Sequence, residues 1–314
     1  MSAPKTLFFG TSAFAVPSLD VVADRSDLAG VVTQPDRPAG RGQRLQQSPV
    51  KRAALERGLR VYEPRRLRDF ANEIASLAFD VFIVASYGKI LPSELLALPA
   101  LGALNVHPSL LPRYRGATPI QATLLAGDRE TGVTIMLMDA GMDTGDIVLQ
   151  ERLEIGAEED FATLHDRLAK LGARLLGDAL ALGERDGAFP RLPQRGEGSV
   201  TRPIAKPDLE IDWRWDAVRI ANHVRAYAPA PAARAMLAET RVKILKARIG
   251  IGPSTSRLPR HAQGDKGAAG AIAGIDDEAA IVQCGNGTVA IESLIAPNHP
   301  RETGAAFAWR VGRT

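Results

Sequence analysis

The sequence has one cysteine and no long apolar run, and each of these features excludes some classes of protein. Cys284 stands alone, which excludes an internal disulfide and leaves no cysteine cluster for zinc. No uninterrupted apolar stretch approaches the roughly 20 residues of a membrane-spanning helix. The first residues also lack the length and cleavage site of a signal peptide. We therefore expect a cytoplasmic protein with no membrane partner.

A dinucleotide fingerprint is also missing after the first apolar run. The segment FFGTSAFAVPS provides one glycine, Gly10, at the place where the fingerprint needs three glycines with separate roles. The sequence therefore argues against a nicotinamide or flavin site.

What the sequence does contain is enough apolar material for a large core and an uneven distribution of charge. Its 314 residues are 45% hydrophobic, which suits one large domain or two ordinary ones. Residues 201–314 hold 16 Lys+Arg against 11 Asp+Glu, a net +5, whereas residues 1–200 hold 23 against 25, a net −2. A mildly basic second half suits an anionic partner, although most such imbalances are only solvated surface.

The first part of the chain alternates short apolar runs with helical patterns. Strands are predicted over residues 6–10, 28–34, 80–88, 102–107, 132–139 and 146–155, and helices over 50–58, 92–99, 117–127 and 160–184. The first four runs are almost continuously apolar, as in a parallel sheet that is covered on both faces. This pattern predicts an α/β fold, a Rossmann-like doubly wound and mostly parallel sheet.

The second part of the chain has a different texture. Residues 187–208 are rich in proline, glycine and charge, which is typical of an extended linker. A short helix over 215–227 is followed by strand-like runs, and CGNGT between two of them predicts a hairpin. We expect a domain at residues 1–188, a linker at 189–207, and a smaller OB-like antiparallel β-barrel at 208–314.

Two polar side chains stand at the end of the strand predicted over 102–107. Because side chains alternate along a strand, Asn105 and His107 share one face and Val106 lies on the other. Pro108 then ends the strand, so both polar groups lie at the carboxyl end, where open α/β sheets bind ligands. The alternative is that both merely satisfy loop backbone.

A loop with three aspartates, Asp139, Asp143 and Asp146, follows the run VTIML about thirty residues downstream. Their spacing does not fit a calcium loop, so we expect no metal. A carboxylate beside a histidine orients the ring and favours its charged form. We expect Asp143 to hold His107 charged, with Asn105 and His107 donating to the oxyanion of an acyl-type transfer to an amine; the other two aspartates support the loop.

These residues resemble a known family. NVHPSLLPRYRGATPIQ together with ETGVTIMLMDAGMDTGD resembles the active-site segments of folate-dependent formyltransferases. TQPDRPAGRGQRLQQSPVK, and RVKILKARI after IDW, resemble the methionyl-tRNA formyltransferases within that family. The resemblance implies an enzyme of translation initiation and one-carbon metabolism. It would transfer the formyl group of 10-formyltetrahydrofolate to initiator methionyl-tRNA, with Asn105, His107 and Asp143 catalytic.

The resemblance also implies a folate site. Its expected residues are a loop and the end of a strand: Ser109, Leu110, Leu111, Pro112, Ser86, Tyr87 and Gly88. The apolar pair of leucines suits a flat pterin or benzoyl ring. The alternative is a plain connecting loop.

Basic residues in two segments are the expected tRNA contacts. Residues 33–52 contain many cations and few apolar residues, which suits phosphate binding, although a surface loop without a role has the same composition. In the second part of the chain, alternation places two cations on one strand face. The expected contacts are Arg37, Arg41, Arg44, Lys51, Arg241 and Lys243, with Arg41 the first choice.

Three other functions remain open at this point. A sugar-nucleotide N-formyltransferase would share the folate donor and the three catalytic residues but would not need the basic loop. In a glycinamide ribonucleotide formyltransferase the second domain would be surplus. A catalytically idle RNA-binding folate sensor would not need Asn105 and His107 as hydrogen-bond donors.

The segments RAYAPAPAARAML, APNHPRETGAAFAWRVGRT and GTSAF depart from the family's usual pattern. We expect a monomer.

Overall fold

The computed structural model describes residues 3–39, 44–250 and 268–312. The chain forms two compact units. Unit 1 comprises Met1–Pro119, Glu130–Glu154 and His165–Arg202, and unit 2 comprises Ile120–Arg129, Ile155–Leu164 and Pro203–Thr314. Among the described residues, no helix is both long enough and apolar enough to cross a membrane.

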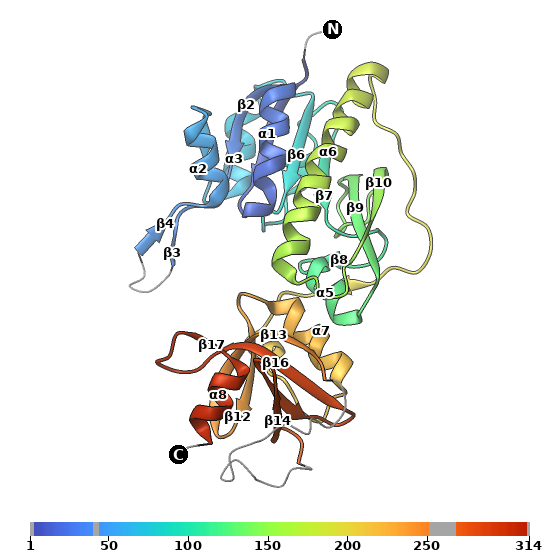
Figure 1. The fold of residues 1–314 in the computed structure, drawn as a ribbon. Helices are drawn as coiled ribbons and strands as arrows, with labels where there is room; N and C mark the ends of the chain where they lie inside the picture. Colours follow the sequence, from blue (N-terminus) through green and yellow to red (C-terminus); the bar gives the residue numbers. More distant parts are fainter. Residues whose placement is uncertain (1–2, 40–43, 251–267, 313–314) are drawn as a thin grey trace. The chain divides into compact units, whose positions relative to one another are not determined.

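The first unit is built on a sheet of seven described strands in the order β10-β9-β7-β6-β1-β2-β5 (Figure 1). Their bounds are β1 (Lys5–Gly10), β2 (Asp27–Val32), β5 (Val61–Tyr62), β6 (Val81–Ala85), β7 (Ala103–His107), β9 (Glu130–Leu137) and β10 (Ile147–Glu154). The five strands from β7 to β5 pair in parallel, whereas β9 and β10 are antiparallel to their neighbours. The predicted mostly parallel, Rossmann-like sheet is confirmed.

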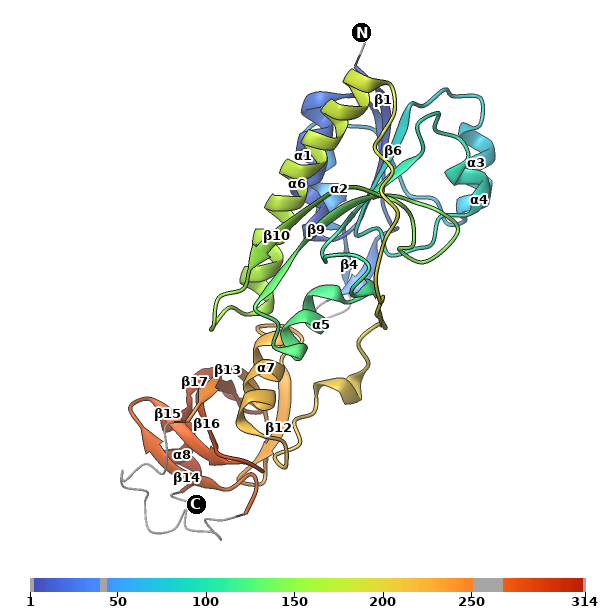
Figure 2. The same ribbon diagram turned by 90° about the vertical axis from the view of Figure 1, so that its right-hand side faces the viewer.

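Helices cover both faces of this sheet, which explains why strands such as β1 and β6 are almost continuously apolar. The helical segments are η1 (Ala13–Ala15), α1 (Val16–Arg25), α2 (Pro49–Glu56), α3 (Leu67–Ile74), α4 (Ser93–Leu96) and α6 (Phe161–Asp186). Figure 2 shows α1 and α6 on one side of the sheet and α3 and α4 on the other. On the second side, Phe70 and Leu95 pack into one cluster with Phe9 and Phe82 of the sheet.

Strand β7 lies near the middle of the sheet, between β6 and β9. Val106 faces α6, where it lies against Gly172, so the alternation of the strand turns Asn105 and His107 to the opposite face. Neighbouring residues on that face include Val84 of β6 and Thr134 of β9, which pair with Asn105 and His107. The sheet thus holds both polar residues on a rigid element.

The segment predicted as a linker makes ordered contacts with the first unit. Strand β11 (Val200–Thr201) pairs in parallel with β8 (Arg115–Gly116), and Leu192 forms a bridge with Ile147 at the start of β10. Proline and glycine disfavour regular elements, which is why the composition suggested an extended linker. Residues 192–202 are instead fastened by backbone pairing to two loops of unit 1.

The second unit contains an antiparallel sheet, as predicted. Its strands run in the order β12-β13-β16-β15-β14, with β17 added beside β16. The elements are η2 (Lys206–Leu209), α7 (Ala217–Tyr227), β12 (Ala233–Leu237), β13 (Thr240–Ile249), β14 (Ile272–Asp276), β15 (Ala279–Gln283), β16 (Thr288–Ile295), β17 (Arg301–Thr303) and α8 (Gly304–Val311). Antiparallel pairing of β15 with β16 confirms the predicted hairpin. Ile220 of α7 and Phe307 of α8 are fully buried in its core.

One helix and one short hairpin remain, and each contains or adjoins a residue of interest. Helix α5 (Pro119–Ala126) starts at the proline expected in its first turn, and the hydroxyl of Thr118 donates to the carbonyl of Arg202. Strands β3 (Arg37–Ala39) and β4 (Arg44–Gln46) form a short antiparallel hairpin in the predicted basic loop.

Candidate active site

The three expected catalytic residues meet at the carboxyl end of β7. The Asn105 amide Nδ2 lies 3.3 Å from Asp143 Oδ1, and His107 Nδ1 lies 3.6 Å from Asp143 Oδ2. His107 is 4% exposed, and the Asp143 side chain is 15% exposed. Two polar side chains on one strand and a carboxylate from a distant loop therefore form a single cluster, as predicted.

The Asp143 loop is held in an unusual backbone conformation. Asp143 itself has φ +54°, a left-handed value that aspartate tolerates better than most residues. Its Oδ2 accepts a hydrogen bond from the backbone N–H of Gly116 at 2.7 Å. Gly116 has φ +98°, and a Cβ there would lie 2.4 Å from the carbonyl oxygen of Thr201. Only glycine fits at this position, so the loop that supports Asp143 depends on it.

Both ring nitrogens of His107 face protein groups, and Nε2 is held by a hydrogen bond. Its Nε2 lies 2.9 Å from the carbonyl oxygen of Tyr114, and a carbonyl can only accept, so Nε2 carries a hydrogen. Nδ1 is therefore the nitrogen that gains or loses a proton, and it faces Asp143. Because both nitrogens face protein groups, the ring in this arrangement has no N–H that can donate to an oxyanion.

The expectation that Asp143 keeps His107 charged is wrong for the protein without substrate. Burial removes the ring from water and lowers the pKa of His107, and this effect exceeds the opposing influences of the Asp143 carboxylate and the Tyr114 carbonyl. The sequence showed the neighbouring carboxylate but could not show how completely the ring is buried. The imidazole is therefore neutral at neutral pH, with Nδ1 free of hydrogen.

The remaining aspartates behave as loop supports. Asp139 Oδ1 accepts hydrogen bonds from the Gly141 N–H at 2.9 Å and from the Thr144 hydroxyl at 2.7 Å. Asp146 pairs through its backbone carbonyl with the N–H of Leu137. In the described part of the chain, no group of three or more His, Cys, Asp or Glu is arranged to hold a metal ion.

The loop expected to contact folate is tied to β9. Ser109 is fully buried, and its hydroxyl donates to the carbonyl of Arg113 at 2.6 Å. Thr134 of β9 donates from its hydroxyl to the Ser109 carbonyl and accepts from the Leu111 N–H. Leu111 is 3% exposed, whereas Leu110 and Pro112 are half-buried. The last two residues are therefore the side chains of this loop that remain accessible.

The end of β6 offers backbone and one hydroxyl, but not a phenol. Ser86 has φ +43° and accepts a hydrogen bond from the Ser12 hydroxyl, and Gly88 has φ +78°. Tyr87 is 2% exposed and packs edge-on against Phe9 in the core. Burial raises the pKa of Tyr87 to about 12. The Tyr87 side chain is therefore packed in the core. The predicted contact of Tyr87 with folate can involve only its backbone.

The expected tRNA contacts of the basic loop differ in how free their charges are. Arg37 is exposed and donates to the side-chain oxygen of Gln34. Lys51 lies in α2, and its amine contacts Asp36 at 2.9 Å and Glu63 at 2.7 Å. The hydrogen bond to Glu63 is the largest of the influences that raise the pKa of Lys51. Lys51 thus already has two carboxylate partners within the protein.

Of the other two predicted contacts in this segment, only Arg44 lies within the described residues. Arg44 begins β4, and the predicted contact Arg41 lies outside the described residues.

In the second unit, the two expected cations of β13 lie on its exposed side. Arg241 forms an ion pair with Glu210 and has a side chain that is 60% exposed, and Lys243 is exposed two residues further on. Val242 between them is 1% exposed. The alternation inferred from the sequence is therefore correct, although one of the two charges is already paired.

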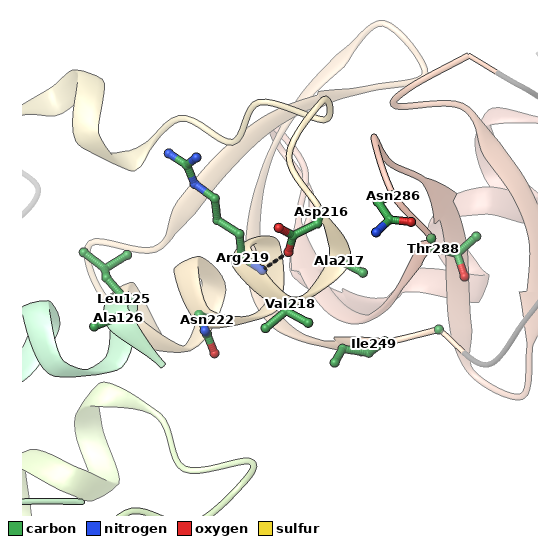
Figure 3. Close-up of a pocket in the computed structure, with 12 residues that line it drawn as sticks. Leu125, Ala126, Asp216, Ala217, Val218, Arg219, Asn222, Ile249, Asn286 and Thr288 are labelled. Carbon is green, nitrogen blue, oxygen red and sulfur yellow. Dashed lines mark hydrogen bonds between the residues drawn. The ribbon is translucent and has the colours of Figure 1, made fainter. Parts of the chain in front are cut away.

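A cavity of about 480 Å³ in the second unit is lined by other chain segments than those that carry the three catalytic residues. Figure 3 shows it beside the start of α7, where Asp216 accepts a hydrogen bond from the N–H of Arg219, and beside Asn286 and Thr288. None of its lining residues is among the predicted site residues. It is therefore not the place where the clustered catalytic residues act.

Three residues that position the cluster were not singled out from the sequence. They are Tyr114, Gly116 and Gln194, which hold His107, the Asp143 carboxylate and the Asp143 backbone, respectively. The glycine in the stretch PRYRG was a visible signal for a special turn. No comparable signal marked Gln194, because a single glutamine in a polar segment has no distinctive pattern.

Comparison with known families places these features in context. The formyl transferase domain matches residues 5–180, and the formyl transferase C-terminal domain matches residues 203–311. The chain belongs to the formyl transferase family. A methionyl-tRNA formyltransferase of Dechloromonas aromatica is 42% identical over 294 residues, covering 92% of this chain and 90% of that protein. One of Burkholderia multivorans is 43% identical over 309 residues, covering 95% and 91%.

Solved structures share the fold of this formyl transferase at much lower identity. An N-formyltransferase from Helicobacter canadensis in complex with folinic acid and dTDP-3-aminofucose has a TM-score of 0.67 and 18% identity, covering 93% of this chain and 99% of that one. A methionyl-tRNA formyltransferase from Clostridium thermocellum has a TM-score of 0.55 and 14% identity, covering 79% and 95%. At these identities the likeness establishes the fold.

Proposed function

We propose that this protein transfers the formyl group of 10-formyltetrahydrofolate to the α-amino group of initiator methionyl-tRNA. The observation that supports this most directly is the convergence of Asn105, His107 and Asp143 at the carboxyl end of β7. The proteins that are 42–43% identical over nearly the whole chain are methionyl-tRNA formyltransferases. The product would be formylmethionyl-tRNA, which is used to initiate translation in the cytoplasm.

The reaction requires one proton to move from nitrogen to nitrogen. The amine attacks the formyl carbon, which gives a tetrahedral oxyanion, and then the bond from that carbon to N10 of the folate breaks. A proton leaves the amine and reaches N10, so the folate departs as tetrahydrofolate with a neutral N10–H. A neutral His107 with a bare Nδ1 is suited to take this proton through water, and Asp143 at 3.6 Å stabilises the imidazolium that forms.

Asn105 is the candidate donor to the oxyanion. Its amide nitrogen has two hydrogens, and Asp143 Oδ1 accepts one of them at 3.3 Å. The second hydrogen remains for the oxygen of the formyl group. Because the amide is anchored by Asp143, it needs no reorganisation when negative charge develops, which is the main advantage of a preorganised donor. Asp143 would thus orient both of the groups that act on the reacting atoms.

The two substrates would be bound by different kinds of surface. Leu110, Pro112 and the backbone at residues 86–88 would line the folate site, and no metal is needed for the transfer. Arg37 at the start of β3, Arg44 at the start of β4 and Arg41 in the same basic segment of the sequence would contact tRNA phosphates, with Lys243 a candidate on the second unit. Charge-assisted contacts to phosphate give affinity that falls as salt rises. We expect the protein to act as a monomer.

The test is single-turnover transfer of labelled formyl from 10-formyltetrahydrofolate, with methionyl-tRNA and an amino-sugar nucleotide offered together. Transfer to the tRNA, together with a loss of tRNA affinity in Arg41→Ala that shrinks as salt rises, is the expected result. Transfer to the sugar alone would assign the sugar-nucleotide function and would refute the proposed role of the basic segment. Transfer to neither acceptor would refute the proposed reaction.

A further inference from the structure

Residues 192–202 fasten the two loops that complete the catalytic cluster. The Leu192 backbone pairs with Ile147, which directly follows the Asp143 loop, with N···O distances of 2.8 and 3.0 Å. Ser199 accepts from the N–H of Tyr114 through its hydroxyl and from the N–H of Arg115 through its carbonyl, both at 2.8 Å. One segment thus holds the carbonyl partner of His107 on one side and the aspartate loop on the other.

Within this segment, the Gln194 amide uses its full hydrogen-bonding capacity. Its Nε2 donates to the carbonyl of Asp143 at 2.9 Å and to the carbonyl of Gly145 at 2.8 Å. Its Oε1 accepts from Arg115 Nε at 3.1 Å and from Arg115 Nη2 at 2.6 Å. An amide has two hydrogens and two acceptor positions, so all four are occupied. Because carbonyls only accept and guanidinium only donates, no other residue type of this size makes the same four bonds.

The hydrogen bonds of the Gln194 amide lead to Asp143 by two routes. The first is direct, from Gln194 to the Asp143 carbonyl. The second runs through Arg115, whose neighbour Gly116 donates its N–H to the Asp143 carboxylate at 2.7 Å. Because protein groups occupy all four hydrogen-bonding positions of the Gln194 amide, none is left for a substrate. The influence of Gln194 on the reaction must therefore pass through the position of Asp143.

We propose that Gln194 is a positioning residue for the formyl transfer, which fixes the Asp143 carboxylate between Asn105 and His107. The kinetic part of this proposal rests on the proposed function. When the amide is lost, the loop with φ +54° at Asp143 is no longer held by the two carbonyl contacts. The carboxylate then spends less time beside Nδ1 of His107, and a misplacement of about 1 Å commonly costs on the order of 100-fold in rate.

The experiment compares Gln194→Leu and Gln194→Glu with Gln283→Leu as a matched control. Gln283 also donates from Nε2 to two backbone carbonyls of a turn, those of Cys284 and Gly287, but in the second unit. Glutamate keeps the acceptor for Arg115 and loses both donors to the aspartate loop. We expect both Gln194 variants to lower kcat by roughly 10- to 100-fold with KM for either substrate changed less than about threefold. The control should keep the rate of the unaltered protein.

A second readout does not require turnover. The His107 ring is followed by NMR as pH changes, with its signal assigned by comparison with His107→Ala. Because the Asp143 carboxylate raises the pKa of His107, a displaced carboxylate should lower that pKa in both Gln194 variants. A role limited to folding would change the melting temperature but not this titration.

Each outcome decides the inference. A lowered pKa of His107 together with a fall in kcat supports the proposal. An unchanged pKa of His107 refutes the proposal, even if kcat and the melting temperature both fall. Wild-type kinetics in Gln194→Glu would also refute it, since that variant lacks both donors. If the unaltered protein does not formylate methionyl-tRNA, the proposed function fails, while the titration still tests whether Gln194 positions Asp143.

Discussion

The polar residues of β7 and those of β13 have very different surroundings, although both lie on central strands. His107 on β7 is 4% exposed, and the pKa of its ring is lowered by burial. Arg241 and Lys246 on β13 have side chains that are 60% and 52% exposed and pair with carboxylates at the surface. Exposed ion pairs are screened by water and contribute about 0–1 kcal/mol, whereas a buried titratable group changes its protonation. Burial therefore alters the protonation of a polar side chain on β7, whereas the exposed charges on β13 contribute little to stability.

The largest expected effect is the loss of a catalytic side chain from β7. Asn105→Ala and His107→Ala should each lower the single-turnover rate of formyl transfer by roughly 100- to 1000-fold, because one removes an oxyanion donor and the other a proton acceptor. His299→Ala, which changes an exposed histidine in the second unit, is the control and should retain the rate. Rates within about tenfold of the unaltered protein for both β7 variants would contradict the assignment.

The second effect concerns the backbone that supports Asp143. Gly116→Ala places a Cβ 2.4 Å from the Thr201 carbonyl at φ +98°, so the β8–β11 contact must move. We expect a loss of about 1–3 kcal/mol of unfolding free energy, together with slower transfer.

Gly58→Ala is the control for backbone strain alone. Gly58 has φ +66°, and a Cβ added there would have no atom within 4 Å, so alanine at this position costs only about 1 kcal/mol and leaves the rate unchanged. Chemical denaturation and single-turnover kinetics measure both variants. Equal behaviour of the two would show that the close contact with Thr201 has no consequence.

The third effect is a dependence of stability on pH. Burial lowers the pKa of His107 in the folded protein below its unfolded value of about 6.5, so the unfolded chain binds the proton first. Stability is therefore complete above about pH 6.5 and is lost as pH falls toward the folded pKa. His107→Gln should flatten this dependence for unit 1.

The second unit offers the matched comparison. His223 of α7 is 5% exposed between Trp215 and Tyr227, and burial lowers the pKa of His223 as well. His223→Gln should flatten the dependence of unit 2 and leave that of unit 1 intact. Denaturation at about pH 7.5 and about pH 5, with probes in each unit, measures both slopes. An unchanged slope in His107→Gln would show that His107 is not the titrating group.

The smallest effect is expected on the exposed side of β13. Arg241→Ala removes the ion pair with Glu210, whose side chains are 60% and 41% exposed. We expect a change of less than about 1 kcal/mol in unfolding free energy, which becomes smaller still at high salt. A double-mutant cycle with Glu210→Ala measures the coupling. A coupling above about 2 kcal/mol would mean that this pair is far less screened than its exposure indicates.

The elements that sequence predicted well are those with strong periodicity. The apolar run that became β7, the long helix α6 and the hairpin of β15 and β16 all match their predicted segments, because burial on one or both faces imposes a regular pattern. Helix α3 was not predicted. Its cap residue Arg66 makes no capping hydrogen bond, and an eight-residue helix provides few repeats of the pattern.

The candidate site was predictable where its residues lie close together in the chain, and less so elsewhere. Asn105 and His107 are two residues apart on one strand, so alternation alone places them together. Asp143 was identified through its loop composition and the family resemblance. Gln194 lies 51 residues beyond Asp143 in a segment without periodicity, and its contact depends on how the chain returns across unit 1.

The sequence by itself determined the alternating pattern of elements, the face shared by Asn105 and His107, and membership in the formyl transferase family. These depend on local periodicity and on short motifs, both of which can be read along the chain. Only the tertiary structure decided that His107 is neutral, that Lys51 is already paired, and that the proline- and glycine-rich segment holds the Asp143 loop. Each of these depends on desolvation or on contacts between distant segments, which arise when the chain folds.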